Sequence, residues 1–446
     1  MLKIFIPNNF LPERKYIIDT IFNYFLGLKY KLDFHNEKSY IILLENDYKI
    51  IFKDAFFSKF DQKKSYLLKE NLPKKVCFTS HIFTSETNIP VIFGSNKIEI
   101  LDKKIVSEND IFASSFFMLT RWEELIIKDK DNHNRFPEEL SFAIKNKIHF
   151  RPVVNEYVEM LWNMLTFFKI NQSRKKQKYE AIITHDIDFI KRYDKLSKLI
   201  KAIGGDIILR KNPFLIPKTI KKYINIKKGK EKDLYDTFDY LMDISDENNL
   251  ISRFYFIPGM LGETDVRYNI TNNFVSETIK KIIDRGHIVG LHGTYDGYNS
   301  SEKFTEELER LKKIYPKIKE GRQHYLRFEN PKTWQIWNNN NLQYDSTIGY
   351  SKNGGFRAGT CYEYPIFDLM ERKKLSLIER PLIAMEGAIK LSYPEPKQFY
   401  KKIIELKNIV KKYNGKFVFL WHNSNINIEE WRVYFSNYKS IIKEIA

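Results

Sequence analysis

Short apolar runs alternate with amphipathic segments along the second half of the chain. The runs have the length and the aliphatic and aromatic content of buried strands, and they lie at residues 181–183, 252–257, 287–292 and 417–420. Segments with helical spacing separate them, for example at 234–247 and 271–285. This alternation predicts parallel βα units in an α/β fold, whose ligand sites lie at the carboxyl ends of the strands.

The first half has a different pattern and predicts a smaller α+β domain over residues 1–170. We expect a helix from Leu11 to Leu26, and a helix capped by Asp110 that continues to Trp122. A further helix is expected from Pro152 to Phe168, and short strands are expected at 40–44, 49–52, 89–94 and 98–100 with a turn at Gly94–Asn96. Catalytic residue types do not cluster here, so we interpret this half as non-catalytic.

A polar and basic stretch, 171–178, reads as a linker, and the second domain is then expected to span 178–446. Within it, residues 191–232 are rich in lysine and amphipathic, which predicts a basic helical insertion over the mouth of the site or along the surface. The net charge of +18 comes mostly from scattered lysines, which would favour acidic glycans, nucleic acid or anionic lipid.

The remaining composition excludes several classes of protein. A hydrophobic fraction of 43% over 446 residues supports packed domains and argues against a disordered chain. Cys77 and Cys361 are isolated, which argues against a disulfide framework and fits a reducing compartment. Uninterrupted apolar stretches of about 18 residues are absent, so we predict no membrane span, and a cytoplasmic location.

Two carboxylates directly follow the apolar run at 181–183. Asp186 and Asp188 share one face of the strand, because successive side chains alternate. Neighbouring carboxylates repel unless a cation lies between them or one takes a proton, which indicates a metal or acid–base site. The alternative is an ordinary strand-end turn, in which Asp is common.

Further polar residues end the later strands. His292 and His422 each follow an apolar run, as metal-ligating or catalytic histidines do, whereas His287 lies on the opposite face and reads as structural. The segment 322–328 looks strand-like and contains Arg322, His324 and Arg327. Together these positions predict one site at the mouth of a βα barrel.

The order of these motifs resembles the polysaccharide deacetylases of carbohydrate esterase family four, the NodB-homology proteins, over roughly residues 178–430. Three segments carry the resemblance: Thr184-His185-Asp186-Ile187-Asp188, the Gly286–His292 segment, and Leu420-Trp421-His422. The first 170 residues resemble an uncharacterised domain that accompanies such deacetylases. The implied fold is a distorted (β/α) barrel of the deacetylase type, preceded by the smaller α+β domain.

The chain departs from the family at three places. Ile187 separates the two acids, Asp296 replaces the family's second histidine, and the Arg-x-Pro segment lacks its proline. The resemblance implies a divalent cation, most of all zinc, held by Asp188 and His292 with a third ligand from His324 or Asp296.

The resemblance also implies the catalytic roles. Asp186 would be the general base, oriented by Arg327 in preference to Arg322, and His422 the general acid, supported by a carboxylate such as Asp345. A backbone N–H near Thr294 or Tyr295 would hold the oxyanion, and Trp421, Tyr295 and Tyr298 are candidates for stacking on sugars.

The function that this implies is metal-dependent removal of an N-acetyl group from an amino sugar of a polysaccharide or its precursor. The partner is then a carbohydrate, and nucleic acid is not expected because a recognisable nucleic-acid motif is absent. Two other hypotheses stay open: a non-catalytic glycan-binding or scaffold protein on a decayed barrel, and binding of acidic polymers through the lysine-rich insertion.

Overall fold

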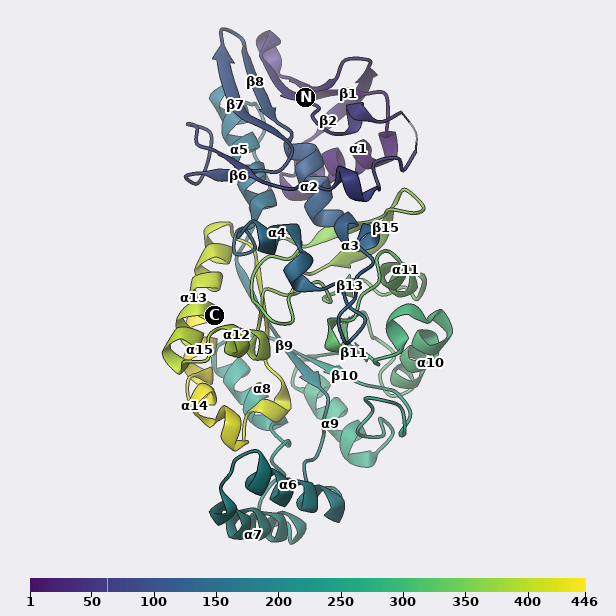
Figure 1. Cartoon of the computed structure of the whole chain (residues 1–446), viewed down its shortest axis with the longest axis vertical. Helices are drawn as coiled ribbons and strands as arrows, with labels where there is room; N and C mark the ends of the chain where they lie inside the picture. The colour runs from purple at the N-terminus through teal and green to yellow at the C-terminus, as the bar shows by residue number, and fades with distance from the viewer. Residues whose placement is uncertain (62) are drawn as a thin grey trace.

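The computed structural model describes residues 1–61 and 63–446, which form two sheets and a separate helical projection. Figure 1 shows the first sheet at one end, the larger second sheet in the middle, and helices α6 and α7 at the opposite end. The chain thus has a mixed α/β fold, as the alternating pattern predicts.

The first sheet has six strands, in the order β2-β1-β3-β4-β8-β7. Its strands are β1 Leu2–Pro7, β2 Tyr30–His35, β3 Ser39–Leu43, β4 Lys49–Lys53, β7 Gly94–Leu101 and β8 Lys104–Asn109. Helices α1 (Leu11–Ile18), α2 (Ile111–Thr120) and α5 (Val153–Phe167) accompany it. The Asp110 carboxylate accepts from the Ala113 N–H at 2.9 Å, which confirms the predicted cap of α2.

Two expectations for this region were wrong in detail. The predicted helix from Leu11 changes at Asp19 into a π-helix that ends at Phe25. The expected turn at Gly94–Asn96 lies inside β7, which pairs with β8, while β6 (Ile89–Val91) pairs with β5 (Cys77–Thr79). Gly94 has φ +94°, so the chain bends at this residue without forming a hairpin.

The second sheet has nine strands, in the order β14-β15-β13-β12-β11-β10-β9-β17-β16. All pairs from β15 to β16 are parallel, and β14 pairs antiparallel with β15. The strands are β9 Glu180–Ile187, β10 Ser252–Phe256, β11 Ile288–Gly293, β12 Glu320–Gln323, β13 Tyr344–Asp345, β14 Tyr364–Asp368, β15 Lys373–Glu379, β16 Ala384–Met385 and β17 Lys416–Leu420. Among the strands that the structure describes, β14 and β16 end the order unpaired with each other, so the predicted barrel is not shown to close.

Helices cover this sheet and connect its parallel strands (Figure 1). They are α8 Phe238–Glu247, α9 Asn273–Asp284, α10 Ser301–Lys312, α11 Lys332–Asn339, α12 Glu386–Ser392, α13 Pro396–Lys412 and α15 Tyr438–Ile445. The right-to-left run of parallel neighbours brings the carboxyl ends of β9, β10, β11, β12 and β17 to one edge. The predicted site residues follow these ends.

The segment 322–328 is not a continuous strand. β12 ends at Gln323, and His324–Leu326 form a short 3-10 turn in which Tyr325 and Leu326 have φ of 57° and 54°. Left-handed backbone is uncommon for such side chains, and here it turns the chain sharply after the strand. Arg322 therefore stays inside the sheet, whereas Arg327 lies beyond the turn.

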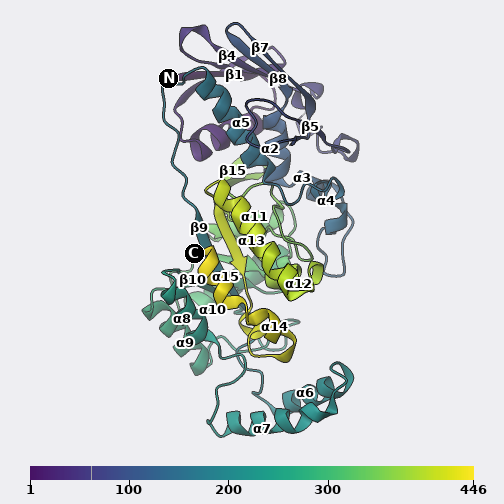
Figure 2. The ribbon, with the colours of Figure 1, turned by 90° about the vertical axis from the view of Figure 1, so that its left-hand side faces the viewer.

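Residues 1–170, called the first unit below, pack against the β14–β15 edge of the second sheet (Figure 2). The Tyr16 hydroxyl donates to the Pro365 carbonyl, and Arg372 forms an ion pair with Glu13 at 2.7 Å. Arg357, from the glycine-containing loop, pairs with the buried Glu124 at 2.7 Å. The two parts are thus joined by buried polar contacts.

Helices α6 (Leu196–Ile208) and α7 (Ile216–Lys227) form the predicted basic insertion and project away from the second sheet (Figures 1 and 2). Over the described residues, helices long and apolar enough to cross a membrane are absent. Cys77 and Cys361 are both free thiols.

Candidate metal centre

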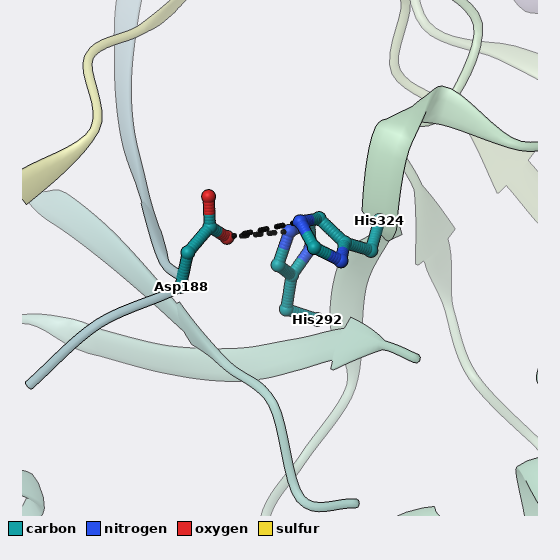
Figure 3. A group of neighbouring side chains, drawn as sticks. All are labelled: Asp188, His292 and His324. Carbon is teal, nitrogen blue, oxygen red and sulfur yellow. Dashed lines mark ion pairs between the residues drawn. The ribbon is translucent and has the colours of Figure 1, made fainter. Parts of the chain in front are cut away.

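Three side chains from different strand ends meet at the carboxyl edge of the second sheet: Asp188, His292 and His324 (Figure 3). Asp188 follows β9, His292 lies in β11, and His324 follows β12. Their ligand atoms all lie within 4.8 Å of one another. The Asp188 Oδ1 atom is 3.4 Å from Nε2 of His292 and 3.4 Å from Nε2 of His324.

These separations suit a shared cation better than direct pairing. A tetrahedral zinc ion with ligand bonds of about 2.0–2.2 Å places neighbouring ligand atoms roughly 3.3–3.6 Å apart. Direct N–H···O hydrogen bonds are shorter, and both Asp188 Oδ1 and His292 Nε2 are buried without a hydrogen-bond partner. Since His292 Nδ1 lies 2.9 Å from the Arg322 carbonyl and donates to it, Nε2 keeps its lone pair for the site.

Asp265 supports the third of these residues. Its Oδ2 atom lies 2.5 Å from Nδ1 of His324 and also accepts from the Tyr295 N–H at 2.7 Å. Burial would lower the pKa of His324, but Asp188 and Asp265 outweigh it and raise this pKa to about 9. A carboxylate behind a histidine is the usual arrangement around metal-ligating imidazoles, so the donor set fits a divalent cation.

Asp186 lies beside this cluster, on the same face of β9 as Asp188. Its Oδ2 atom is 3.6 Å from Nε2 of His292, and its Oδ1 atom accepts from Arg322 at 2.8 Å. Burial opposes ionisation of Asp186, but Arg322 outweighs it and lowers the pKa of this carboxyl below its ordinary value. The guanidinium partner of Asp186 is therefore Arg322, and the expectation of Arg327 was wrong.

Arg327 instead joins the first unit to the loop after β11. Its Nε donates to the His133 carbonyl at 2.8 Å, and its Nη1 donates to the Tyr295 carbonyl. The guanidinium also lies over the rings of Tyr295 and Tyr298, at 3.8 and 3.9 Å from their centroids. The left-handed turn before Arg327 directs it here, away from Asp186.

Asp296 does not join the metal cluster. Its side chain is 51% exposed and lies 3.6 Å from Lys303 and 3.7 Å from Arg327. The geometry therefore favours His324 over Asp296 as the third ligand, although this residue assignment stays a proposal.

His422 lies on the other side of Asp188. Its Nε2 is 3.8 Å from Asp188 Oδ2, and its Nδ1 is 2.6 Å from Oε1 of Glu386. Burial opposes the charged imidazole, but Glu386 and then the two site aspartates raise the pKa of His422 to about 10. Glu386 follows β16, the neighbour of β17, so the two side chains leave adjacent strand ends.

Asp345 is not the partner of His422. β13, which it ends, is separated from β17 by four strands in the sheet order. Its carboxylate accepts from Thr347 N at 3.0 Å and from the Thr347 hydroxyl, and it lies beside Glu379, its register partner on β15. Burial raises the pKa of Asp345 above its ordinary value.

The predicted oxyanion donors are already occupied. The Thr294 N–H donates to Glu307 at 3.0 Å, and the Tyr295 N–H donates to Asp265. Glu307 is fully buried, and burial raises its pKa to about 7. Trp421 is buried among aromatic side chains and Tyr298 is 8% exposed, so neither stands free to stack on a sugar.

An aromatic rim, here Tyr295, Tyr325 and His133, borders the cluster. Tyr325 is 42% exposed, and its ring centroid is 4.4 Å from that of the ligand candidate His324. His133, from the first unit, lies 4.6 Å from Tyr325 between centroids and 3.3 Å from the Tyr295 hydroxyl. Arg135 fixes the contact by donating to the Tyr325 carbonyl at 2.8 Å.

Several of these residues escaped the sequence interpretation. Asp265 and His133 lie in irregular segments without a periodic signal, and Glu386 is 36 residues from its partner His422. The two other strand histidines are structural. His185 bonds to the Trp421 carbonyl and Ser252, and His287 accepts from the Ser252 N–H, which agrees with the expectation for His287.

Comparisons with known proteins are sparse. The model of a family of unknown function, DUF7033, matches residues 2–170. Curated proteins yield no match. The second half of the picture comes from solved structures alone.

Two solved structures are similar at low identity. A Mycobacterium smegmatis protein described as a polysaccharide deacetylase has 15% identity and a TM-score of 0.38, covering 61% of this chain and 85% of its own. A CE4 family pseudoenzyme from Bacillus anthracis has 11% identity and a TM-score of 0.29, covering 48% of this chain and 57% of its own. At these values the likenesses support no activity, and the geometry above carries the proposals that follow.

Proposed function

We propose that the chain is a metal-dependent hydrolase that removes an N-acetyl group from an amino sugar of a polysaccharide or its precursor. One observation carries this proposal: the Asp188–His292–His324 cluster lies between an Arg-paired carboxylate, Asp186, and a carboxylate-paired imidazole, His422. A ligand cluster flanked by a base and an acid is what hydrolysis of an amide requires. The division into domains 1–170 and 178–446 belongs to this proposal.

Asp188, His292 and His324 would hold the cation, and zinc suits one carboxylate and two imidazoles. When bound, zinc supplies Lewis acidity toward the acyl oxygen and makes a water molecule more acidic. Asp265 would keep the His324 ring in place through the hydrogen bond to Nδ1. Arg322 serves both neighbours, because its carbonyl orients His292 while its guanidinium holds Asp186.

Asp186 would accept the proton of the attacking water. Arg322 holds Oδ1, so Oδ2 is the oxygen that faces the ligand cluster. The lowered pKa of Asp186 keeps it ionised near neutral pH but also makes it a weak base, so the reaction depends on a water that is more acidic than bulk water.

His422 would donate a proton to the amine that leaves. Glu386 accepts from Nδ1 and stabilises the charged imidazole, while Nε2 points toward Asp188. The carbon–nitrogen bond then breaks with its electrons on nitrogen, and the proton from Nε2 makes the neutral amine product. Glu386 acts through His422 and is a positioning residue.

The aromatic rim is the surface on which a sugar ring would stack. Tyr325 is held in a left-handed conformation beside His324, and the contact with His133 brings the first unit to the edge of the site. We therefore assign the first unit a share in binding the glycan next to the reacting sugar.

Measurement of acetate release from N-acetylated amino sugars and their oligomers tests the proposal. We expect release by the zinc-loaded protein, and on the order of 100-fold slower release by His422→Asn. A protein that binds metal and oligosaccharide but releases no acetate would instead support the non-catalytic scaffold, the reading that the changed histidine motif at Asp296 favours.

A further inference from the structure

We propose that helices α6 and α7 dock the protein on the surface of an anionic lipid bilayer. The docking surface, called the hairpin below, consists of residues 196–228. It projects at the end of the molecule opposite the first sheet, so a flat partner can reach it (Figures 1 and 2). This inference does not depend on the activity proposed above.

The hairpin exposes an unusual density of large apolar side chains. Eight of the 24 exposed large hydrophobic side chains of the described residues lie in it, although it is a small part of the chain. The most exposed are Phe214 at 89%, Leu209 at 80% and Ile208 at 73%, all at or beside the connection between the two helices. Such contiguous exposure marks an interaction surface rather than ordinary scattered residues.

The exposed residues are not the hairpin's core. Leu199 and Ala202 of α6 face inward and pack with Tyr193, Leu234 and Tyr235. On the outer side, Leu196, Ile200 and Ile207 fall within about 40° of one another at 3.6 residues per turn, and they are 60%, 64% and 49% exposed. Because α6 already has a packed face, the second apolar stripe is available to a partner.

The charge of the hairpin selects the kind of partner. Residues 196–228 contain nine Lys and Arg side chains and one carboxylate, Asp206, which pairs with Arg210 at 2.5 Å. Two copies of such a surface would repel each other, so an anionic partner is favoured. An acidic polymer would use only the charges, whereas a bilayer accommodates both the lysines and the exposed Phe214 and Leu209.

The attachment of the hairpin relates it to the metal centre. Residues 189–195 lead from the end of β9, directly after Asp188, into α6. Docking would therefore hold the carboxyl edge of the second sheet near the bilayer. If the proposed function holds, this favours an amino sugar carried at the membrane surface over one free in solution.

Flotation of the full-length protein with vesicles tests the inference. One set of vesicles contains one part phosphatidylglycerol to three parts phosphatidylcholine, and the other contains phosphatidylcholine alone. We expect flotation only with the first set and weaker binding at higher salt. Replacing Lys211, Lys218 and Lys221 by Gln should weaken binding about fivefold for each charge, on the order of 100-fold in all.

A second variant separates insertion from charge attraction. The triple change Ile208→Ser, Leu209→Ser and Phe214→Ser keeps every charge, and we expect it to weaken binding about tenfold or more for each side chain. Matched controls on the first unit, Lys31, Lys38 and Lys103 to Gln and Phe78, Ile82 and Leu101 to Ser, should bind as the wild type does. Retained thermal unfolding would confirm that the variants fold.

Three results would overturn the inference. Wild-type protein that stays with the soluble fraction at low salt rules out docking on anionic lipid. Binding that the lysine changes abolish but the serine changes leave intact would indicate an acidic polymer as partner. A dimer that Phe214→Ser dissociates, without vesicle binding, would indicate a second copy of the chain.

Discussion

The identity of the third metal ligand gives the sharpest test of the site. Replacing His324 by Ala removes Nε2, which lies 3.4 Å from Asp188 Oδ1. Replacing Asp296 by Ala removes a carboxylate that is 51% exposed and pairs only with Lys303 and Arg327 among the ion pairs of the described chain. The two residues are the alternatives that the sequence leaves open, so the pair of variants decides between them.

The expected magnitudes differ widely. Structural zinc sites with four ligands bind with about 10–16 kcal/mol, or about 3 kcal/mol for each ligand. Loss of His324 should then weaken zinc binding on the order of 100-fold. Loss of Asp296 removes an exposed charge and should change the affinity by no more than about twofold. Asp265→Asn, which keeps the shape but weakens the support of His324, should cost about 10-fold to 100-fold.

Competition with a fluorescent chelator measures all three affinities at one pH. The order of affinity that we expect is wild type and Asp296→Ala together, then Asp265→Asn, then His324→Ala. A large loss in Asp296→Ala with little change in His324→Ala would refute the assignment. Unfolding curves of the metal-free variants control for a general loss of structure, because a folding defect would appear there as well.

Three further predictions concern other parts of the structure. Glu386→Gln should lower kcat for acetate release by about 10-fold or more with zinc content unchanged, while Asp345→Asn should not remove the His422 support; the two pH–rate profiles compare them. His133→Ala should raise KM for an oligosaccharide but leave a monosaccharide substrate unaffected, as steady-state kinetics would show. The wild type should lose up to about 3 kcal/mol of unfolding free energy as pH rises from about 4.5 to about 7, because folded Glu307 keeps a proton that the unfolded chain releases; Glu307→Gln should remove this slope in urea titrations at both ends of the window.

The sequence predicts those site residues that strand alternation and strand ends can place. Asp186 and Asp188 point to one side because they are two residues apart on β9, and His292 and His422 end buried strands at the same sheet edge. The parallel βα arrangement follows from the same apolar runs. Both are consequences of period-two alternation and of burial on two faces.

The partners of these residues could not be predicted in the same way. The choice between Arg322 and Arg327 depends on a left-handed turn at Tyr325 and Leu326, and non-glycine side chains give no signal for it. Glu386 meets His422 because β16 and β17 are neighbours, and strand order is a tertiary property. Closure of a barrel depends on pairing at the sheet ends, which the apolar runs do not encode.

The central claim is that the strand ends hold a metal ion, and elemental analysis of the purified protein tests it most directly. The measurement follows incubation with zinc and removal of excess metal, with His292→Ala as the comparison. We expect near-stoichiometric zinc in the wild type and its loss in the variant, because His292 supplies a buried, unpaired Nε2 to the cluster. Wild-type protein without bound metal would contradict the claim and with it the proposed hydrolase.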